Sequence, residues 1–389
     1  MKFLSIAALA FLALASSANA APAQVQAIPN KYIITLKADA DQTQFTRALN
    51  AEVARENSQE GAGIQSKIEH TYQIADFKGY SGTFTKALVD RLKNNPRVAA
   101  VEEDLPVFAL GTQENPPSWG LTRVGQRTRS IPGPYVFPDN RGSGVTVYVV
   151  DTGVLTTHSD FGGRATHGFS SDPSWPRSDD NGHGTHVAST VAGTLHGVAK
   201  NARIVGVKVL SGSGSGSNSG VIAGINWVAE QARAAGRTVV ANMSLGGGRN
   251  TATNNAVAAA TRAGVVFAVA AGNESQDACN VSPASEPSAI TVASSTRTDS
   301  LSSFSNFGRC VDIIAPGSEI TGAWNNGGVR TISGTSMASP HVAGGAALLL
   351  GANPGLTPAE VASTLTSRAT TNAITGNIRG TPNRLLFVN

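Results

Sequence analysis

Apolar and polar positions divide the chain into two parts with different patterns. In the first part, short strand-like apolar runs are separated by two segments whose apolar residues recur every three or four positions, as on one face of a helix. The predicted order is strand, helix, strand, strand, helix, strand, over residues 31–37, 43–57, 67–75, 79–84, 85–94 and 98–103. This order is typical of a small α+β unit with the split βαβ arrangement.

A different pattern begins at residue 144. Nearly continuous apolar runs alternate with helix-length segments, as expected when parallel strands are buried on both faces and joined by helices. The predicted strands are 145–150, 204–210, 238–244 and 265–271, and the predicted helices are 219–235, 252–263 and 357–368. We therefore expect an α/β domain with a doubly wound parallel sheet, covered by helices on both faces, that binds ligands beyond the carboxyl ends of its strands.

Two segments are rich in turn-forming residues. The segment 106–120 gathers Gly, Pro, Asn and Ser, and it is the expected domain boundary. The repetitive segment 212–220 resembles a flexible linker in composition, but it is too short to separate domains. We expect it to form a loop or an irregular edge strand.

The N-terminal sequence indicates export. Lys2 precedes a mostly apolar run over residues 3–15, and the sequence Ala-Asn-Ala that ends at residue 20 has the small-x-small pattern of a signal-peptidase site. A spanning helix needs about 20 apolar residues, which no segment approaches, so a membrane anchor is disfavoured. We expect residues 1–20 to be a signal peptide, and the protein to be secreted and extracellular with no membrane partner.

Composition narrows the class of protein. Of the 389 residues, 14% are charged and 41% are hydrophobic, which is typical of a globular protein with a large core. The net charge of +4 comes from singly scattered basic residues, so we expect no nucleic-acid partner. The two cysteines, Cys279 and Cys310, are expected to form a disulfide in an oxidising compartment, with two buried free thiols as the alternative.

Two candidate catalytic residues lie near the end of a predicted strand and the start of a predicted helix. Asp151 directly follows the strand 145–150, where it could also be a simple turn cap. His183 lies between two glycines just before a helix of small residues, so its imidazole can project into a cleft toward a carboxylate such as Asp151. A metal site shared with His186 is the alternative, but no carboxylate or cysteine follows at a suitable ligand spacing.

Asn273 and Ser336 complete the candidate chemistry. Asn273 could be only a turn residue, yet its amide can donate a hydrogen bond to a developing oxyanion. Ser336 is expected just before a helix that begins near residues 337–340, at the positive end of the helix dipole and with an unpaired N–H. Three neighbouring polar residues are expected to be structural, namely Ser333, Ser339 and His341.

Five segments together resemble the subtilisin-like serine proteases, and within them the proteinase K group. They are VYVVDTG (147–153), NGHGTHVA (181–188), SLGGG (244–248), AVAAGN (268–273) and SGTSMASPHVAG (333–344), and they occur in the family's order. Each motif alone is weak to moderate evidence. The resemblance implies a subtilisin-like peptidase domain preceded by a small ferredoxin-like α+β propeptide.

The resemblance implies a serine endopeptidase with an Asp-His-Ser triad and an acyl-enzyme mechanism. Ser336 would be the nucleophile and His183 its general base and then acid, while Asp151 would orient the imidazole and stabilise its charged form. Asn273 would donate to the oxyanion, and no catalytic metal or organic cofactor is expected. The adjacent base is needed because a serine hydroxyl is a poor nucleophile until its proton is removed.

The implied substrate is an extended polypeptide that pairs with the enzyme's main chain like an added β-strand. The residues expected to pair with it are Gly214, Ser215, Gly216, Ser244, Leu245 and Gly246. A roomy, uncharged pocket for the residue before the cut is expected to be lined by Ala270, Ala271 and Gly272. We therefore expect broad specificity that favours apolar or aromatic side chains at this P1 position.

The first unit resembles the propeptide of these zymogens, which helps the protease fold and then inhibits it. Residues 21–110 would be this inhibitory and chaperone propeptide, and residues 111–389 a monomeric peptidase domain. Cleavage after Leu110 would offer an apolar residue to the pocket. A second domain that is never removed is the alternative.

Two further segments, 282–290 and 311–317, resemble those that hold a structural calcium ion in proteinase K relatives. The resemblance implies ligands from the Pro287 and Ala289 carbonyl oxygens and the Asp312 carboxylate. One carboxylate with carbonyls and waters suits a hard, oxygen-seeking cation.

Two other functions match parts of the sequence. A catalytically silent binding or chaperone protein could keep the fold, but all four candidate catalytic residues are present. A lipase or esterase would have a G-x-S-x-G segment around its serine and a hydrophobic lid, and neither is evident around Ser336. Peptide release from casein without hydrolysis of a long-chain triglyceride would separate peptidase from lipase.

Overall fold

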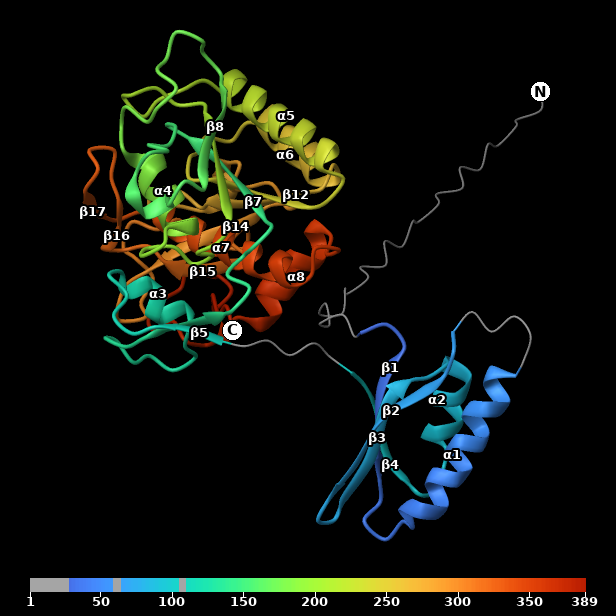
Figure 1. Ribbon diagram of the computed structural model, residues 1–389. Helices are drawn as coiled ribbons and strands as arrows, with labels where there is room; N and C mark the ends of the chain where they lie inside the picture. The colour runs from blue at the N-terminus through green and yellow to red at the C-terminus, as the bar shows by residue number, and fades with distance from the viewer. Residues whose placement is uncertain (1–27, 59–63, 105–109) are drawn as a thin grey trace, which may run out of the picture.

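The computed structural model describes residues 28–58, 64–104 and 110–389 (Figure 1). In these ranges the chain forms two units, each with its own hydrophobic core. None of the helices in these ranges is both long and apolar enough to cross a bilayer. The expected signal peptide lies outside the described residues.

The N-terminal unit has the predicted order of strands and helices. Its elements are β1 (Lys31–Leu36), α1 (Gln42–Asn57), β2 (Lys67–Ile74), β3 (Phe77–Thr83), α2 (Lys86–Lys93) and β4 (Val98–Glu103). The strands form an antiparallel sheet in the order β2-β3-β1-β4. Both helices cover one face of it (Figure 1), and their buried residues, such as Phe45 and Leu88, pack against Ile34 and Tyr80 of the sheet. The predicted ferredoxin-like arrangement is therefore confirmed.

The second unit is built on a nine-stranded sheet with the order β18-β19-β15-β14-β12-β10-β7-β9-β8. Its neighbouring strands are parallel, except for β18 and β19. Its strands are β7 (Thr146–Asp151), β8 (Ala165–Ser170), β9 (Arg203–Lys208), β10 (Val239–Met243), β12 (Val265–Ala270), β14 (Ile290–Ser295), β15 (Ile313–Pro316), β18 (Thr370–Thr371) and β19 (Arg384–Leu385). The four strands predicted from the sequence are consecutive in this order, from β12 to β9.

Short strands pair outside this sheet. The antiparallel pairs are β5 (Leu110–Gln113) with β6 (Tyr135–Pro138), β11 (Gly247–Gly248) with β13 (Val281–Ser282), and β16 (Ile320–Ala323) with β17 (Val329–Ile332). The helices of the second unit are α3 (Trp119–Val124), η1 (Ser159–Phe161), α4 (His183–Ala192), α5 (Asn218–Ala235), α6 (Thr251–Arg262), η2 (Ala278–Asn280), α7 (Thr335–Ala352) and α8 (Pro358–Arg368).

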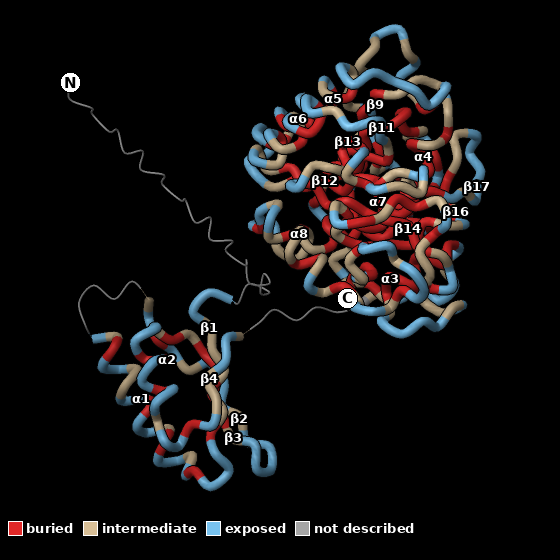
Figure 2. Tube along the Cα trace, turned by 180° about the vertical axis from the view of Figure 1, so that it is seen from behind, coloured by how far each residue is buried: buried red, intermediate tan, exposed pale blue. Residues whose placement is uncertain are grey.

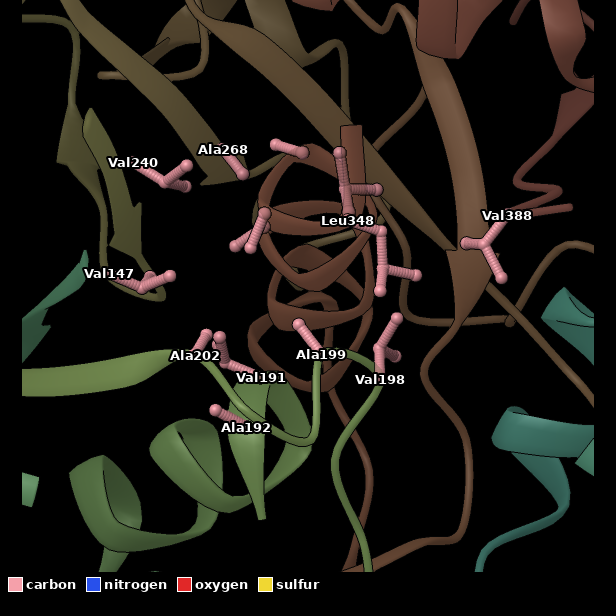
Figure 3. Packing of buried hydrophobic residues seen from close by; sticks show 14 of the residues in the cluster. Val147, Val191, Ala192, Val198, Ala199, Ala202, Val240, Ala268, Leu348 and Val388 are labelled. Atoms are coloured by element: carbon pink, nitrogen blue, oxygen red, sulfur yellow. The ribbon is translucent and has the colours of Figure 1, made fainter. Parts of the chain in front are cut away.

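Both faces of the large sheet are buried under helices (Figures 1 and 2). In β7, Val147 and Val149 belong to the hydrophobic cluster that includes α4 and α7, while Tyr148 and Val150 belong to the cluster of α5 and α6. Figure 3 shows Val147 among the side chains around α7. Because each face of the strand is buried, the apolar run is continuous rather than alternating, as predicted. Each fully buried valine stabilises the fold by roughly 1.5 to 3 kcal/mol.

The parallel strands bring four chain segments to one edge of the sheet. The strand β7 ends at Asp151, β10 leads into Ser244, β12 leads into Asn273, and β9 leads into the loop 211–217. That loop has no strand of its own, and α5 begins at residue 218 with the Ser217 side chain as its cap. The prediction of a loop at 212–220 is therefore confirmed for residues 212–217, while residues 218–220 belong to α5.

Candidate active site

Asp151 and His183 form a hydrogen-bonded pair. Asp151 is the last residue of β7 and is fully buried, and its Oδ1 accepts the Thr152 N–H and lies 2.7 Å from His183 Nδ1. His183 is the first residue of α4, and the preceding Gly182 has a φ of +112°, a conformation that favours glycine. The His183 side chain is 26% exposed, so the imidazole borders the cleft while Asp151 holds its inner nitrogen.

The surroundings of His183 favour its charged form. Burial opposes the positive charge, but the Asp151 charge and hydrogen bond, together with the Asp179 charge, outweigh burial and raise the pKa of His183 above 6.5. His186 differs, because its Nε2 donates to the Ile320 carbonyl and burial lowers its pKa to about 4. The two histidines therefore have separate partners, which gives no support to the alternative of a shared metal.

Ser336 lies in the first turn of α7, which begins at Thr335 rather than near residues 337–340 as predicted. The longer helix is possible because of where its proline lies. Pro340 has no N–H to bond the Ser336 carbonyl four residues earlier. That carbonyl instead accepts the Ser244 hydroxyl at 2.7 Å, so the proline leaves no unpaired group.

A buried chain of hydrogen bonds joins α7 to β10. Ser339 Oγ donates to Asn242 Oδ1 at 2.8 Å, and Asn242 Nδ2 donates to Ser244 Oγ at 2.8 Å. Ser244 in turn bonds the Ser336 carbonyl, so the sheet holds the backbone of Ser336 in place. The residues predicted to be structural are each bonded within the fold, namely Ser333, Ser339 and His341.

The Ser336 hydroxyl lies 3.2 Å from the Ser244 carbonyl and donates to it. Among the described residues, no hydrogen bond joins this hydroxyl to His183. Catalytic bonds of this kind are often long without substrate and tighten when it binds. Ser336 and His183 line two adjoining pockets that share Leu245, Gly246 and Gly247. The structure therefore brings the predicted carboxylate, base and nucleophile to one region.

Asn273 is oriented by α7. Its Oδ1 accepts the Thr335 N–H at 2.8 Å and the Thr335 hydroxyl at 3.0 Å. Its Nδ2 has no hydrogen-bond partner among the described residues, and the side chain lies at the pocket beside Ser336. The amide can thus donate to an oxygen held next to Ser336. The sequence did not predict this role for Thr335, although the residue directly precedes Ser336 in the motif.

The longer pocket is a cleft of about 510 Å³ between the loop 211–217 and the segment after β10. All six residues predicted to pair with substrate line it, together with His183: Gly214, Ser215, Gly216, Ser244, Leu245 and Gly246. Several of their main-chain groups are exposed, as an added strand requires.

The smaller pocket, of about 250 Å³, differs in two ways from the prediction. Ala270 and Gly272 line it, but Ala271 is fully buried in another hydrophobic cluster. Glu274 also lines it, so the prediction of an uncharged lining is wrong. The Glu274 Oε2 accepts the Asn273 N–H and an Asn306 amide hydrogen, which holds the carboxylate at the pocket wall.

Comparisons with known proteins identify the family. The subtilase family matches residues 142–383, which is more than half of the chain. The chain belongs to the subtilase family. The peptidase inhibitor I9 family matches residues 31–109, the first unit of this subtilase.

The subtilase is similar to curated proteases along most of its length. It is 44% identical to "Alkaline serine exoprotease A" of Vibrio alginolyticus, over 93% of this chain and 68% of the relative. It is 42% identical to a "Cuticle-degrading serine protease" of Arthrobotrys oligospora, over 98% of each chain. A solved structure titled "Crystal structure of a cold adapted subtilisin-like serine proteinase" has 54% identity and a TM-score of 0.67, and the match covers 70% of this chain and 98% of that one. The subtilase is therefore a serine endopeptidase with an I9 propeptide unit.

The two cysteines of the subtilase form a disulfide, as predicted. Cys279 in η2 is bonded to Cys310, with their Cα atoms 5.4 Å apart. The alternative of two free thiols is therefore wrong. The bridge connects the segment after the Asn273 turn to the segment that precedes β15, 31 residues further along the chain.

The residues expected to hold calcium match the chemistry of a hard cation. Asp312 Oδ2 accepts the Thr291 N–H at 2.8 Å, and burial raises the pKa of Asp312 to about 6. A cation would replace the hydration that this carboxylate loses. Pro287 and Ala289 lie in the segment just before Ile290, which pairs with β12, and their carbonyls are the other expected ligands.

Proposed function

We propose that the chain is the precursor of a secreted serine endopeptidase that removes its own propeptide. The hydrogen bond between His183 and Asp151, at the sheet edge that also carries Ser336, is the observation that supports this most directly. Residues 1–20 are proposed as the signal peptide, 21–110 as the inhibitory propeptide and 111–389 as the monomeric peptidase. The name of a Thermus relative, 44% identical to this chain, describes it as an "Extracellular serine proteinase", which supports secretion.

In the proposed mechanism, Ser336 Oγ attacks the carbonyl carbon of the peptide bond while His183 Nε2 takes its proton. The raised pKa of His183 means that Asp151 stabilises the imidazolium that results. His183 then gives this proton to the leaving amine, which separates as the acyl-enzyme forms. A water molecule attacks the acyl-enzyme in the same way and releases Ser336.

Asn273 and the Ser336 N–H are proposed to stabilise the oxyanion. Asn273 Nδ2 is free to donate because Thr335 occupies its Oδ1. The Ser336 N–H lies in the first helical turn, where it has no partner within the helix. Losing one such donor typically costs about 3 to 4 kcal/mol of transition-state stabilisation.

The proposed substrate is an extended polypeptide that lies between the loop 211–217 and the segment 244–246. The exposed main chain on both sides supports pairing without sequence selection. Apolar or aromatic residues are proposed at P1, because Ala270, Gly272 and Val281 line the smaller pocket. Glu274 adds acceptance of basic residues at the pocket wall, so the proposed specificity is broad.

Replacement of the nucleophile tests the proposal. We expect Ser336→Ala to abolish casein hydrolysis and to leave residues 21–110 attached, because the proposed nucleophile is its hydroxyl. Ser333→Ala is the matched control, since this serine of the same motif accepts a bond from Glu319 and is expected to mature and cleave casein.

Mass spectrometry of the purified proteins gives the mature N-terminus, and peptide release gives the activity. Normal maturation of Ser336→Ala would refute cleavage in cis. Hydrolysis of a long-chain triglyceride without release of peptides from casein would contradict the endopeptidase assignment.

A further inference from the structure

A second carboxylate, outside the triad, lies close to His183. Asp179 is 5% exposed, and its two oxygens accept five hydrogen bonds. Oδ1 accepts the Thr152 hydroxyl at 2.8 Å and the N–H groups of Asn181 and Gly182 at 3.0 and 2.9 Å. Oδ2 accepts the N–H and the hydroxyl of Thr185 at 2.9 and 2.6 Å.

The donors to Asp179 belong to the two segments that carry the catalytic pair. Thr152 directly follows Asp151, while Gly182 and Thr185 lie on either side of His183. Thr152 Oγ1 also accepts the Gly184 N–H at 2.9 Å, which adds a second link between the same segments. One buried side chain therefore fixes the end of β7 relative to the start of α4.

The hairpin β16–β17 closes the other side of this loop. Asn325 Nδ2 donates to the Asp179 carbonyl at 3.2 Å. A Cβ atom on Gly182 would overlap the Trp324 ring, so the loop before His183 has no room to shift outward. The His183 loop is thus held between the Asp179 carboxylate and the hairpin.

Within the described ranges, only neutral N–H and hydroxyl groups donate hydrogen bonds to the Asp179 carboxylate. The charged and titratable groups around the His183 loop come from several elements, and they are Asp151, His158, Asp180, His186, Lys208 and Arg330. Lys208 pairs with Asp180 at 2.6 Å and donates to the Thr152 carbonyl, so it does not bond Asp179. The Asp179 charge helps raise the pKa of His183, after the larger effects of the Asp151 charge and hydrogen bond.

A carboxylate is required at this position because every partner of its side chain is a donor. An amide in the same place would turn its NH₂ group toward the donors of one side, for example the Thr185 N–H and hydroxyl. Those donors would be left unsatisfied, which costs about 1 to 3 kcal/mol each when buried.

We propose that Asp179 is a positioning residue for catalysis, which holds His183 and Asp151 in register. Asp179 touches no substrate and acts through His183. The proposal rests on the assignment of His183 as the general base. It predicts an effect on turnover and on its pH dependence, which a purely structural carboxylate would not produce.

The test compares Asp179→Asn with Asp160→Asn in the mature enzyme. Asp160 is the matched control, because its buried carboxylate also accepts several bonds, from Ser189, Leu195 and His196, but none from residues 151–152 or 181–185, which flank the catalytic pair. The concentration of active sites is measured by titration with a serine-directed covalent inhibitor. The kcat and kcat/KM for a peptide substrate are then measured per active site against pH.

For Asp179→Asn we expect kcat per active site to fall by about tenfold to a hundredfold. We also expect the acid limb of kcat/KM to move to lower pH, because loss of the negative charge lowers the pKa of His183. Asp160→Asn should lower the melting temperature and leave both quantities per active site unchanged. An Asp179→Asn enzyme with the kcat and pH profile of the wild type would overturn the proposal.

A second pair of variants applies if Asp179→Asn does not fold. Thr152→Val removes the hydroxyl that connects Asp179 to the Gly184 N–H, whereas Thr152→Ser keeps it. A fall in kcat for Thr152→Val, restored in Thr152→Ser, supports the proposal, and an unchanged kcat refutes it. Failure of the proposed function itself would look different, since the wild type would then be inactive or Ser336→Ala fully active.

Discussion

At the scale of residues, His183, Asn273 and Ser336 are each held through an atom that faces the protein. Asp151 holds His183 Nδ1, Thr335 holds Asn273 Oδ1, and Ser244 holds the Ser336 carbonyl. Among the described residues, His183 Nε2 and Asn273 Nδ2 have no hydrogen-bond partner. Groups that face the cleft are therefore free for substrate, while groups that face the protein are fixed, which is the preorganisation that catalysis needs.

The pH dependence of turnover follows from the His183 environment. His183 must be neutral to accept a proton, and the Asp151 and Asp179 charges raise its pKa above 6.5. Activity is therefore lost as pH falls through this raised pKa, and we expect the acid limb of kcat/KM above pH 6.5. The measurement is a pH profile with a peptide that has no ionisable groups. A limb at or below pH 6.5 would contradict the stabilisation of the imidazolium.

At the scale of elements, the start of α4 depends on the hairpin β16–β17. His186 donates to the Ile320 carbonyl at 3.0 Å, and the Ala323 N–H donates to Ser189 Oγ at 3.0 Å. These bonds fix the hairpin along the helix, and Trp324 then covers Gly182. The position of His183 is therefore set in part by a hairpin about 140 residues further along the chain.

A glycine substitution tests this packing. Gly182 and Gly264 have similar positive φ angles, +112° and +100°, but only at Gly182 would a Cβ overlap the Trp324 ring. Gly264→Ala should lower the free energy of unfolding by about 1 to 2 kcal/mol from conformation alone, with normal kcat per active site. Gly182→Ala should lower the free energy of unfolding by more than Gly264→Ala does, and it should also lower kcat. Urea unfolding of the inhibited enzyme and active-site titration give both quantities, and equal effects would argue against a role for the hairpin.

At the scale of the whole molecule, the chain joins a small α+β unit to a large α/β domain. Each has its own buried cluster, so neither depends on the other for its hydrophobic core. The stability of the larger domain is increased by the Cys279–Cys310 bridge, which contributes about 3.7 kcal/mol in the chain-entropy model. After removal of the propeptide, this domain is expected to retain its fold.

Calcium removal is predicted to lower the melting temperature of the mature domain. Asp312 has a pKa of about 6, above its usual 3.8, so without a cation its ionisation destabilises the fold as pH rises through this range. A bound cation reverses this penalty, and at a hundredfold excess over Kd it adds about 2.7 kcal/mol. A chelator should therefore lower Tm more at pH 8 than at pH 5.

Calorimetry of the enzyme inactivated by a serine-directed inhibitor measures this change without self-digestion. Asp312→Asn is the control, and its Tm should respond little to the chelator. An equal Tm with and without chelator at pH 8 would rule out a structural ion at this site.

Local patterns were sufficient for the elements of the N-terminal unit, for four of the nine strands of the large sheet and for the motif residues. The buried run 145–150 became β7, and its final Asp151 bonds the imidazole that two glycines allow to project. The start of α7 was predicted too late, because the tolerance of Pro340 depends on Ser244, which is distant in sequence. The sequence did not predict Glu274 at the smaller pocket or a role for Asp179 in the loop before His183. The role of each residue depends on which hydrogen-bond donors surround it.

The sequence by itself determined the two-unit organisation, the parallel sheet and the identity of the candidate carboxylate, base and nucleophile. These follow from short-range periodicity and from motifs whose residues are neighbours in the chain. Only the tertiary structure decided that Thr335 orients Asn273, that Ala271 is turned away from the pocket, and that Asp179 joins the two catalytic segments. Hydrogen bonds and burial depend on groups brought together by folding, and no local pattern specifies which groups meet.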